Sequence, residues 1–148
     1  MIIDDDLNKA EDMYKENILD HYKNPRNYGD MKTADVEHTE FNALCGDKIR
    51  LMLKIEKEVI KDIKFTSQGC AISKSSMSML SEEIKGKTLL QAKKIVKQDV
   101  FKMLNIPISA VRTKCALLPL DLLKNTIKIY ENYKEKKQYL NQAINGVL

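Results

Sequence analysis

The chain has 148 residues, of which 43% are hydrophobic and 31% are charged, and its formal net charge is +4. We expect one globular domain over residues 1–148, because this length buries a sufficient core without disulfides. The composition excludes a membrane protein, since no apolar run approaches the length of a bilayer span. It gives nucleic-acid binding little support, since no basic run is interleaved with aromatic residues.

The first half of the chain predicts one helix followed by three short strands. Apolar residues at spacings of three and four mark a helix from residue 4 to about residue 22, which includes His21 as a packed, hydrogen-bonded side chain. Strands follow from Val36 to about Asn42, over the alternating residues 49–55, and over residues 59–66. A tight turn joins the last two strands into a hairpin, so the sheet is antiparallel.

The next segment predicts two helices. The helix over residues 71–85 begins with small residues, chiefly serines, which allow a neighbouring backbone to approach closely. Gly86 suits the position just after its end, where a left-handed backbone is common. Thr88 and Gln91 have the spacing of a capping box and start another helix that runs through Val96.

The remaining pattern predicts a short helix and a long one. The short helix runs from Asp99 to about Asn105, and the last helix begins at Cys115, so that Pro119 lies near its first turn. The tail after Tyr139 is expected to fray. The predicted fold class is therefore α+β, a small three-stranded antiparallel sheet with about five helices packed against it.

Three cysteines fall at the ends of predicted elements. Cys45 lies in a loop after a strand, Cys70 at a strand-to-helix junction, and Cys115 at the start of a helix. None of them lies within an apolar periodic stripe, which is where an inert core cysteine would lie. A helix N-terminus lowers the pKa of a thiol and favours the thiolate, which is both nucleophile and metal ligand. The residues alone leave open whether these cysteines are structural or share one site.

Asp47 adds a possible fourth ligand. It lies two residues after Cys45, and a turn at Gly46 could aim the thiol and the carboxylate at one point. Three thiolates and a carboxylate can hold zinc, and they can also hold a [2Fe–2S] cluster, which four cysteines normally bind. An oxygen ligand should hold a cluster more loosely, which suits a protein that gives its cluster away.

Several short motifs complete the pattern. They are Ile18-Leu19-Asp20-His21-Tyr22, Asn24-Pro25-Arg26-Asn27-Tyr28-Gly29, Cys45-Gly46-Asp47, Gly69-Cys70-Ala71-Ile72-Ser73, Gly86-Lys87 and Lys114-Cys115-Ala116. With these motifs in this order, the chain resembles the iron–sulfur cluster assembly scaffold family, which comprises IscU, the N-terminal domain of NifU, and SufU. The resemblance implies the family's fold, and it implies that Cys45, Asp47, Cys70 and Cys115 bind the cluster.

Lys114 separates two groups within this family. Many IscU proteins have histidine at this position, whereas a basic residue is typical of SufU-like members. SufU proteins also carry an inserted segment before the third cysteine, which this chain lacks. Lys114 is either a solvated charge or electrostatic support for Cys115 as a thiolate, and we expect Cys115 to accept persulfide sulfur.

The resemblance implies a scaffold rather than an enzyme. It would build a [2Fe–2S] cluster from iron and from sulfur supplied by a cysteine desulfurase, with a reductant, and pass it to apo-proteins or carriers. We expect the cytoplasm as its compartment, since the acidic N-terminus is unlike a secretory signal. One alternative is a SufU-like zinc-dependent sulfurtransferase. The other is a structural zinc domain, although such domains more often carry Cys-x-x-Cys pairs.

Overall fold

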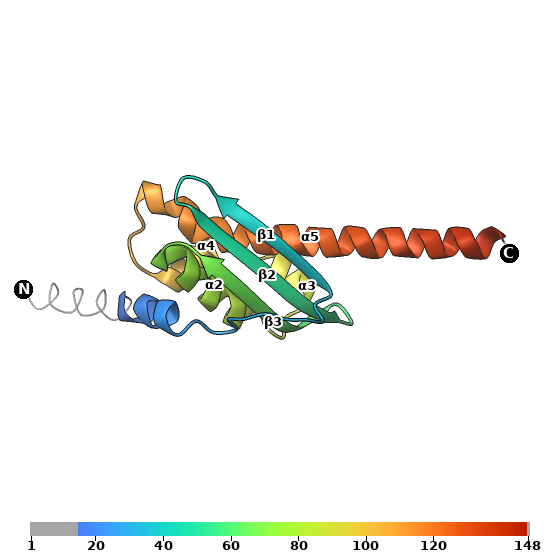
Figure 1. The fold of residues 1–148 in the computed structure, drawn as a ribbon, viewed down its shortest axis with the longest axis horizontal. Helices are drawn as coiled ribbons and strands as arrows, with labels where there is room; N and C mark the ends of the chain where they lie inside the picture. The colour runs from blue at the N-terminus through green and yellow to red at the C-terminus, as the bar shows by residue number, and fades with distance from the viewer. Residues whose placement is uncertain (1–14, 148) are drawn as a thin grey trace, which may run out of the picture.

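A three-stranded antiparallel sheet forms one layer of the fold (Figure 1). The computed structural model describes residues 15–147. The strands are β1 (Val36–Asn42), β2 (Asp47–Glu56) and β3 (Val59–Gln68), and β2 pairs with both neighbours. The predicted antiparallel sheet and its hairpin are thereby confirmed.

The alternation of β2 decides which face of the sheet is buried. Ile49, Leu51 and Leu53 are fully buried, as expected for one apolar face of a strand. The hairpin to β3 turns at Lys57 and Glu58, which both have positive φ (51° and 64°). Two positive φ values in a two-residue loop match the right-handed twist of the strands that it connects.

Helices pack on one side of this sheet. They are α2 (Ala71–Ile84), α3 (Leu89–Lys93), α4 (Lys97–Leu104) and α5 (Ala110–Val147), together with a helix over residues 15–23. The predicted first helix is confirmed over its described part, and residues 4–14 lie outside the described residues. Within the described part of the chain, none of the helices has the length and apolar character needed to cross a membrane.

Local signals correctly place the end of α2 and the start of α3. Thr88 and Gln91 form the predicted capping box, and Gly86 follows α2 with a φ of 87°. The next helix ends at Lys93 rather than Val96, and the one after it begins at Lys97 rather than Asp99.

Serines on α2 attach its neighbours. The Ser75 hydroxyl donates to the carbonyl of Ile18 (2.7 Å), and the Ser76 hydroxyl donates to the carbonyl of Ala116 in α5 (2.8 Å). Both serines are fully buried. A buried hydroxyl is stable when it is hydrogen-bonded, so these small side chains allow close packing and also fix the helices in place.

The last helix differs from its prediction. It begins at Ala110 rather than Cys115, so Pro119 lies in the helix interior and leaves the Cys115 carbonyl without its usual donor. The expected fraying after Tyr139 is wrong, because α5 stays helical through Val147. Side chains 132–146 are all exposed, and Figure 1 shows this part of α5 extending away from the sheet.

His21 is buried between the first helix and α2, as predicted. Its Nδ1 lies 2.7 Å from the Ser78 hydroxyl, and its Nε2 lies 3.6 Å from Glu82. Burial, with a smaller contribution from the Arg26 charge, lowers the pKa of His21 below its ordinary value of 6.5, and the charges of Glu82 and Asp20 oppose this shift. The folded protein therefore favours the neutral ring.

We predict that His21→Gln destabilises the protein more at about pH 7.5 than at about pH 5. A histidine with a lowered folded pKa contributes stability above its unfolded pKa, and this is lost as the pH falls through the folded pKa. The expected loss at the higher pH is about 1–2 kcal/mol, because a buried hydrogen bond disappears. Urea unfolding of both proteins at each pH measures it, and an equal difference at both would contradict the prediction.

Candidate metal centre

Three cysteines meet at one end of the sheet. Cys45 lies in the loop between β1 and β2, Cys70 immediately precedes α2, and Cys115 lies in the second turn of α5. All three are free thiols. The fold therefore brings together residues that are 25 to 70 positions apart in the sequence.

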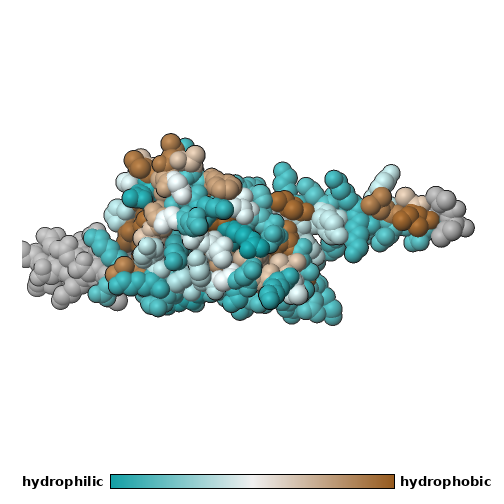
Figure 2. All heavy atoms as spheres, in the orientation of Figure 1, coloured by the Kyte–Doolittle hydropathy of each residue, from teal (hydrophilic) through white to brown (hydrophobic). Residues whose placement is uncertain are grey.

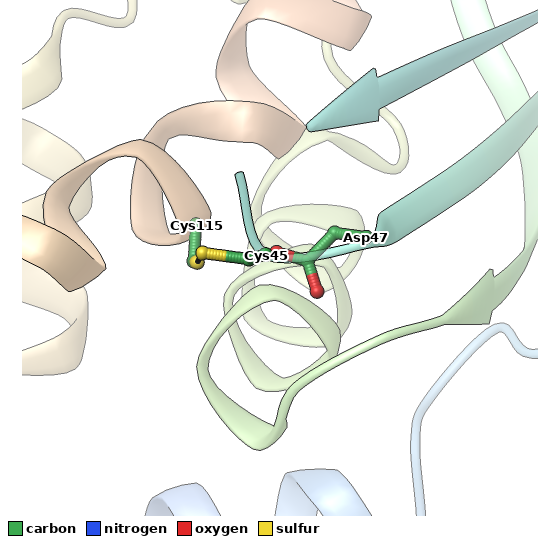
Figure 3. A group of neighbouring side chains, drawn as sticks. All are labelled: Cys45, Asp47 and Cys115. Carbon is green, nitrogen blue, oxygen red and sulfur yellow. Dashed lines mark hydrogen bonds between the residues drawn. The ribbon is translucent and has the colours of Figure 1, made fainter. Parts of the chain in front are cut away.

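Two sulfur atoms lie in close contact in the site. The Sγ atoms of Cys45 and Cys115 are 2.9 Å apart, and Asp47 lies beside them (Figure 3). The ligand atoms of Cys45, Asp47 and Cys115 all lie within 4.8 Å of one another. Cys70 lies just outside this group, with its Sγ 3.9 Å from an Asp47 oxygen and 3.7 Å from the Ser73 hydroxyl.

Asp47 is held by the segment that carries Cys70. It is only 1% exposed, and its Oδ1 accepts the backbone N–H of Cys70 at 2.8 Å. Gly69 makes this approach possible, since a Cβ there would lie 2.1 Å from Asp47 Oδ1. The carboxylate also lies beside the N-terminus of α2, where the helix dipole favours negative charge.

The environment of Cys115 corrects a sequence expectation. Because α5 begins at Ala110, Cys115 is not at the helix N-terminus and does not face its free N–H groups. The side chain is fully buried, and burial together with its hydrogen bond to Cys45 raises the pKa of this thiol well above its ordinary value. Burial therefore disfavours the thiolate form of Cys115.

Arg112 is a cation of the site that the sequence reasoning missed. Attraction to Cys70, with smaller contributions from Cys115, raises the pKa of Arg112 above its ordinary value and places this exposed cation near the two thiols. Its position three residues before Cys115 would have indicated this proximity if the helix start had been placed correctly. Lys114, the cation that we expected to support Cys115, is exposed.

Hydrophobic side chains are exposed next to the site. Phe41, Leu44 and Val111 are 66%, 78% and 74% exposed, and Leu44 directly precedes Cys45. Figure 2 shows hydrophobic residues gathered over the end of the molecule where the β1–β2 loop and the start of α5 lie. Exposed apolar groups of this kind are typical of surfaces that bind other proteins.

The donor set fits a thiophilic metal. Thiolates suit zinc and iron–sulfur clusters, and a single carboxylate completes four donors without favouring calcium or magnesium, which prefer oxygen ligands throughout. The fold and the site together define a small α+β protein whose thiol-rich centre can hold a metal ion.

Comparison with known proteins gives the family. The family described as NifU-like N terminal domain matches residues 13–138. Iron sulfur cluster assembly protein 1, mitochondrial, of Debaryomyces hansenii is 38% identical over an alignment of 131 residues, which covers 85% of this chain and 72% of that one. Iron-sulfur cluster assembly protein IscU of Plasmodium falciparum is 40% identical over an alignment of 126 residues, which covers 83% of this chain and 75% of that one.

A solved structure agrees with these relatives. It is a proposed iron–sulfur cluster assembly scaffold protein for the SUF system of Fervidobacterium islandicum AW-1, with a TM-score of 0.68 and 27% identity. The alignment covers 76% of this chain and 94% of that one. The chain belongs to the NifU-like N terminal domain family, whose relatives include iron–sulfur cluster assembly scaffold proteins. The predicted family is confirmed.

We predict that Gly69→Ala displaces Asp47 and weakens the metal site. The new Cβ would overlap the carboxylate, which should cost about 1–3 kcal/mol in unfolding free energy and at least about ten-fold in zinc affinity. Gly86→Ala is the matched control, because Gly86 also has positive φ (87°) but no heavy atom lies within 4 Å of its added Cβ. Zinc competition titrations should separate the two variants, and equal affinities would contradict the prediction.

Proposed function

We propose that this protein is a scaffold on which a [2Fe–2S] cluster is assembled and from which the cluster passes to apo-proteins. The observation that carries the proposal is the convergence of three free thiols and one buried carboxylate at one exposed end of the fold. The names of the relatives support it, since several are iron–sulfur cluster assembly scaffold proteins. The cluster is the cargo of this protein and not a permanent cofactor.

The ligands that we propose are Cys45, Asp47, Cys70 and Cys115. Three of them already lie close enough to share one ion, and Cys70 adjoins them through Asp47. The soft thiolates would hold the cluster, and the harder carboxylate would be its weakest ligand. Cys115 would be the acceptor of persulfide sulfur, supported electrostatically by Lys114 as the sequence suggests and by Arg112, whose charge interacts with the thiols of Cys70 and Cys115.

The proposed partners follow from the chemistry of assembly. Sulfur would come from a cysteine desulfurase, iron from a donor, and electrons from a reductant, while apo-proteins or carriers would receive the cluster. We propose that the protein itself does not turn over a small substrate. The compartment must keep thiols reduced, and we propose the cytoplasm, although the Debaryomyces hansenii relative is named as mitochondrial.

We predict that anaerobic reconstitution with iron and inorganic sulfide yields about two irons per bound cluster, with the visible absorption of a [2Fe–2S] centre. Replacing one cysteine by serine (C45S, C70S or C115S) should lower the cluster content at least about ten-fold, because a thiolate ligand is lost. Iron and sulfide analysis measures this. If the protein instead took up zinc, resisted iron and still stimulated a desulfurase, the zinc sulfurtransferase alternative would replace the scaffold.

We predict that Asp47→Ala still binds a cluster but transfers it more slowly to an apo-ferredoxin. The bond from oxygen should break first when an acceptor thiol attacks, and the variant lacks this labile position. The variant should also lose about 1–3 kcal/mol of stability, because the N–H of Cys70 loses its acceptor. Transfer rates measured at matched cluster loading show whether Asp47 takes part in ligand exchange or only stabilises the fold. An equal or faster rate in the variant would contradict the prediction.

A further inference from the structure

The two thiols in close contact differ in access. Cys115 is fully buried, whereas Cys45 is partly exposed in a loop whose neighbours Ala43, Leu44 and Gly46 are exposed. If the proposed function is correct, sulfur arrives as a persulfide on another molecule. A sulfur atom on a second protein can reach Cys45 in this conformation, but it cannot reach Cys115 directly.

The contact between the two sulfurs provides a route inward. The two Sγ atoms are 2.9 Å apart, and in Figure 3 the two side chains point at each other from the β1–β2 loop and from α5. Cys70 is also partly exposed, but its sulfur contacts Asp47 and Ser73.

We propose that Cys45 receives the sulfane sulfur from a protein persulfide and passes it to Cys115. In the first step the Cys45 thiolate attacks the outer sulfur of the donor persulfide, and the donor leaves as its thiolate. In the second step the Cys115 sulfur attacks the outer sulfur of the Cys45 persulfide. Cys45 leaves as a thiolate and takes the proton that Cys115 gives up. One S–S bond breaks and one forms in each step, so no external oxidant or reductant is needed.

The local structure allows this transfer. An S–S bond is about 2 Å long, so the extra sulfur on Cys45 needs the space that separates the two Sγ atoms. Cys45 must therefore turn outward when it carries sulfur, and its exposed loop leaves room for this movement. The sulfane sulfur then lies between Cys45 and Cys115. The charge of the nearby Arg112 favours the negative charge of a persulfide formed on Cys115.

The test uses metal-free full-length protein under anaerobic conditions with glutathione persulfide as the donor. The reaction is stopped by alkylation at successive times, and the persulfide is located by peptide mass spectrometry. In the wild type the label should appear first on Cys45 and then on Cys115. In C45S the labelling rate of Cys115 should fall at least ten-fold, and in C115S the label should remain on Cys45.

Several results would overturn the relay. One is labelling of Cys115 in C45S at the wild-type rate, and another is a comparable loss in C70S, which would place the route through Cys70. A Cys45–Cys115 disulfide with release of hydrosulfide would show attack on the inner sulfur instead. If C45S fails to fold, the wild-type time course decides, and labelling of Cys115 without earlier labelling of Cys45 rejects the proposal.

This experiment fails independently of the proposed function. The reconstitution described above uses iron and inorganic sulfide and involves no persulfide, whereas the relay is measured without any metal. A protein that holds a [2Fe–2S] cluster but labels Cys115 directly would reject only the relay. A protein that relays sulfur but holds no cluster would reject only the scaffold.

Discussion

The site depends on a carboxylate that has almost no contact with water. Asp47 is 1% exposed at the start of β2, and a buried carboxylate is stable only where donors or a metal replace its hydration shell. The N–H of Cys70 supplies one such donor, so the sheet and the beginning of α2 are joined through the site itself. The residue before Cys70 must then be glycine, because any side chain would occupy the space of the carboxylate.

The thiols of the site also depend on packing between separate elements. Its thiols come from a loop, from the beginning of α2 and from the second turn of α5, and no two of them share an element. The bond from Ser76 to the carbonyl of Ala116 fixes α5 against α2 one residue away from Cys115. The ligands are therefore assembled only when the sheet and both helices are packed. A metal bound to the folded form alone will stabilise that packing in return.

Signals that act over a few residues predicted most of the fold. The alternation in β2 and the capping box at Thr88 each depend on adjacent residues, and both are confirmed. The start of α5 depends on tertiary packing. Pro119 in a helix interior costs about 3 kcal/mol, but burial of Leu118 and Leu122 contributes about 1.5–3 kcal/mol each, so the helix continues through the proline. Beyond the core, lysine, glutamate and glutamine favour propagation of a helix that has already formed.

The family resemblance predicted which residues belong to the site, but it did not predict how these residues differ in burial. The sequence placed Cys45, Cys70 and Cys115 at the ends of elements, and it gave no sign that the three thiols differ in burial. Burial makes them different: one thiol lies in an exposed loop, one adjoins a carboxylate at a helix start, and one is buried inside the fold. Misplacing the start of α5 by five residues was enough to hide both the burial of Cys115 and the proximity of Arg112 to the thiols. The site therefore has an outer side with an exposed thiol and an inner side with a buried one. This difference in exposure arises from helix packing rather than from the identity of the ligands.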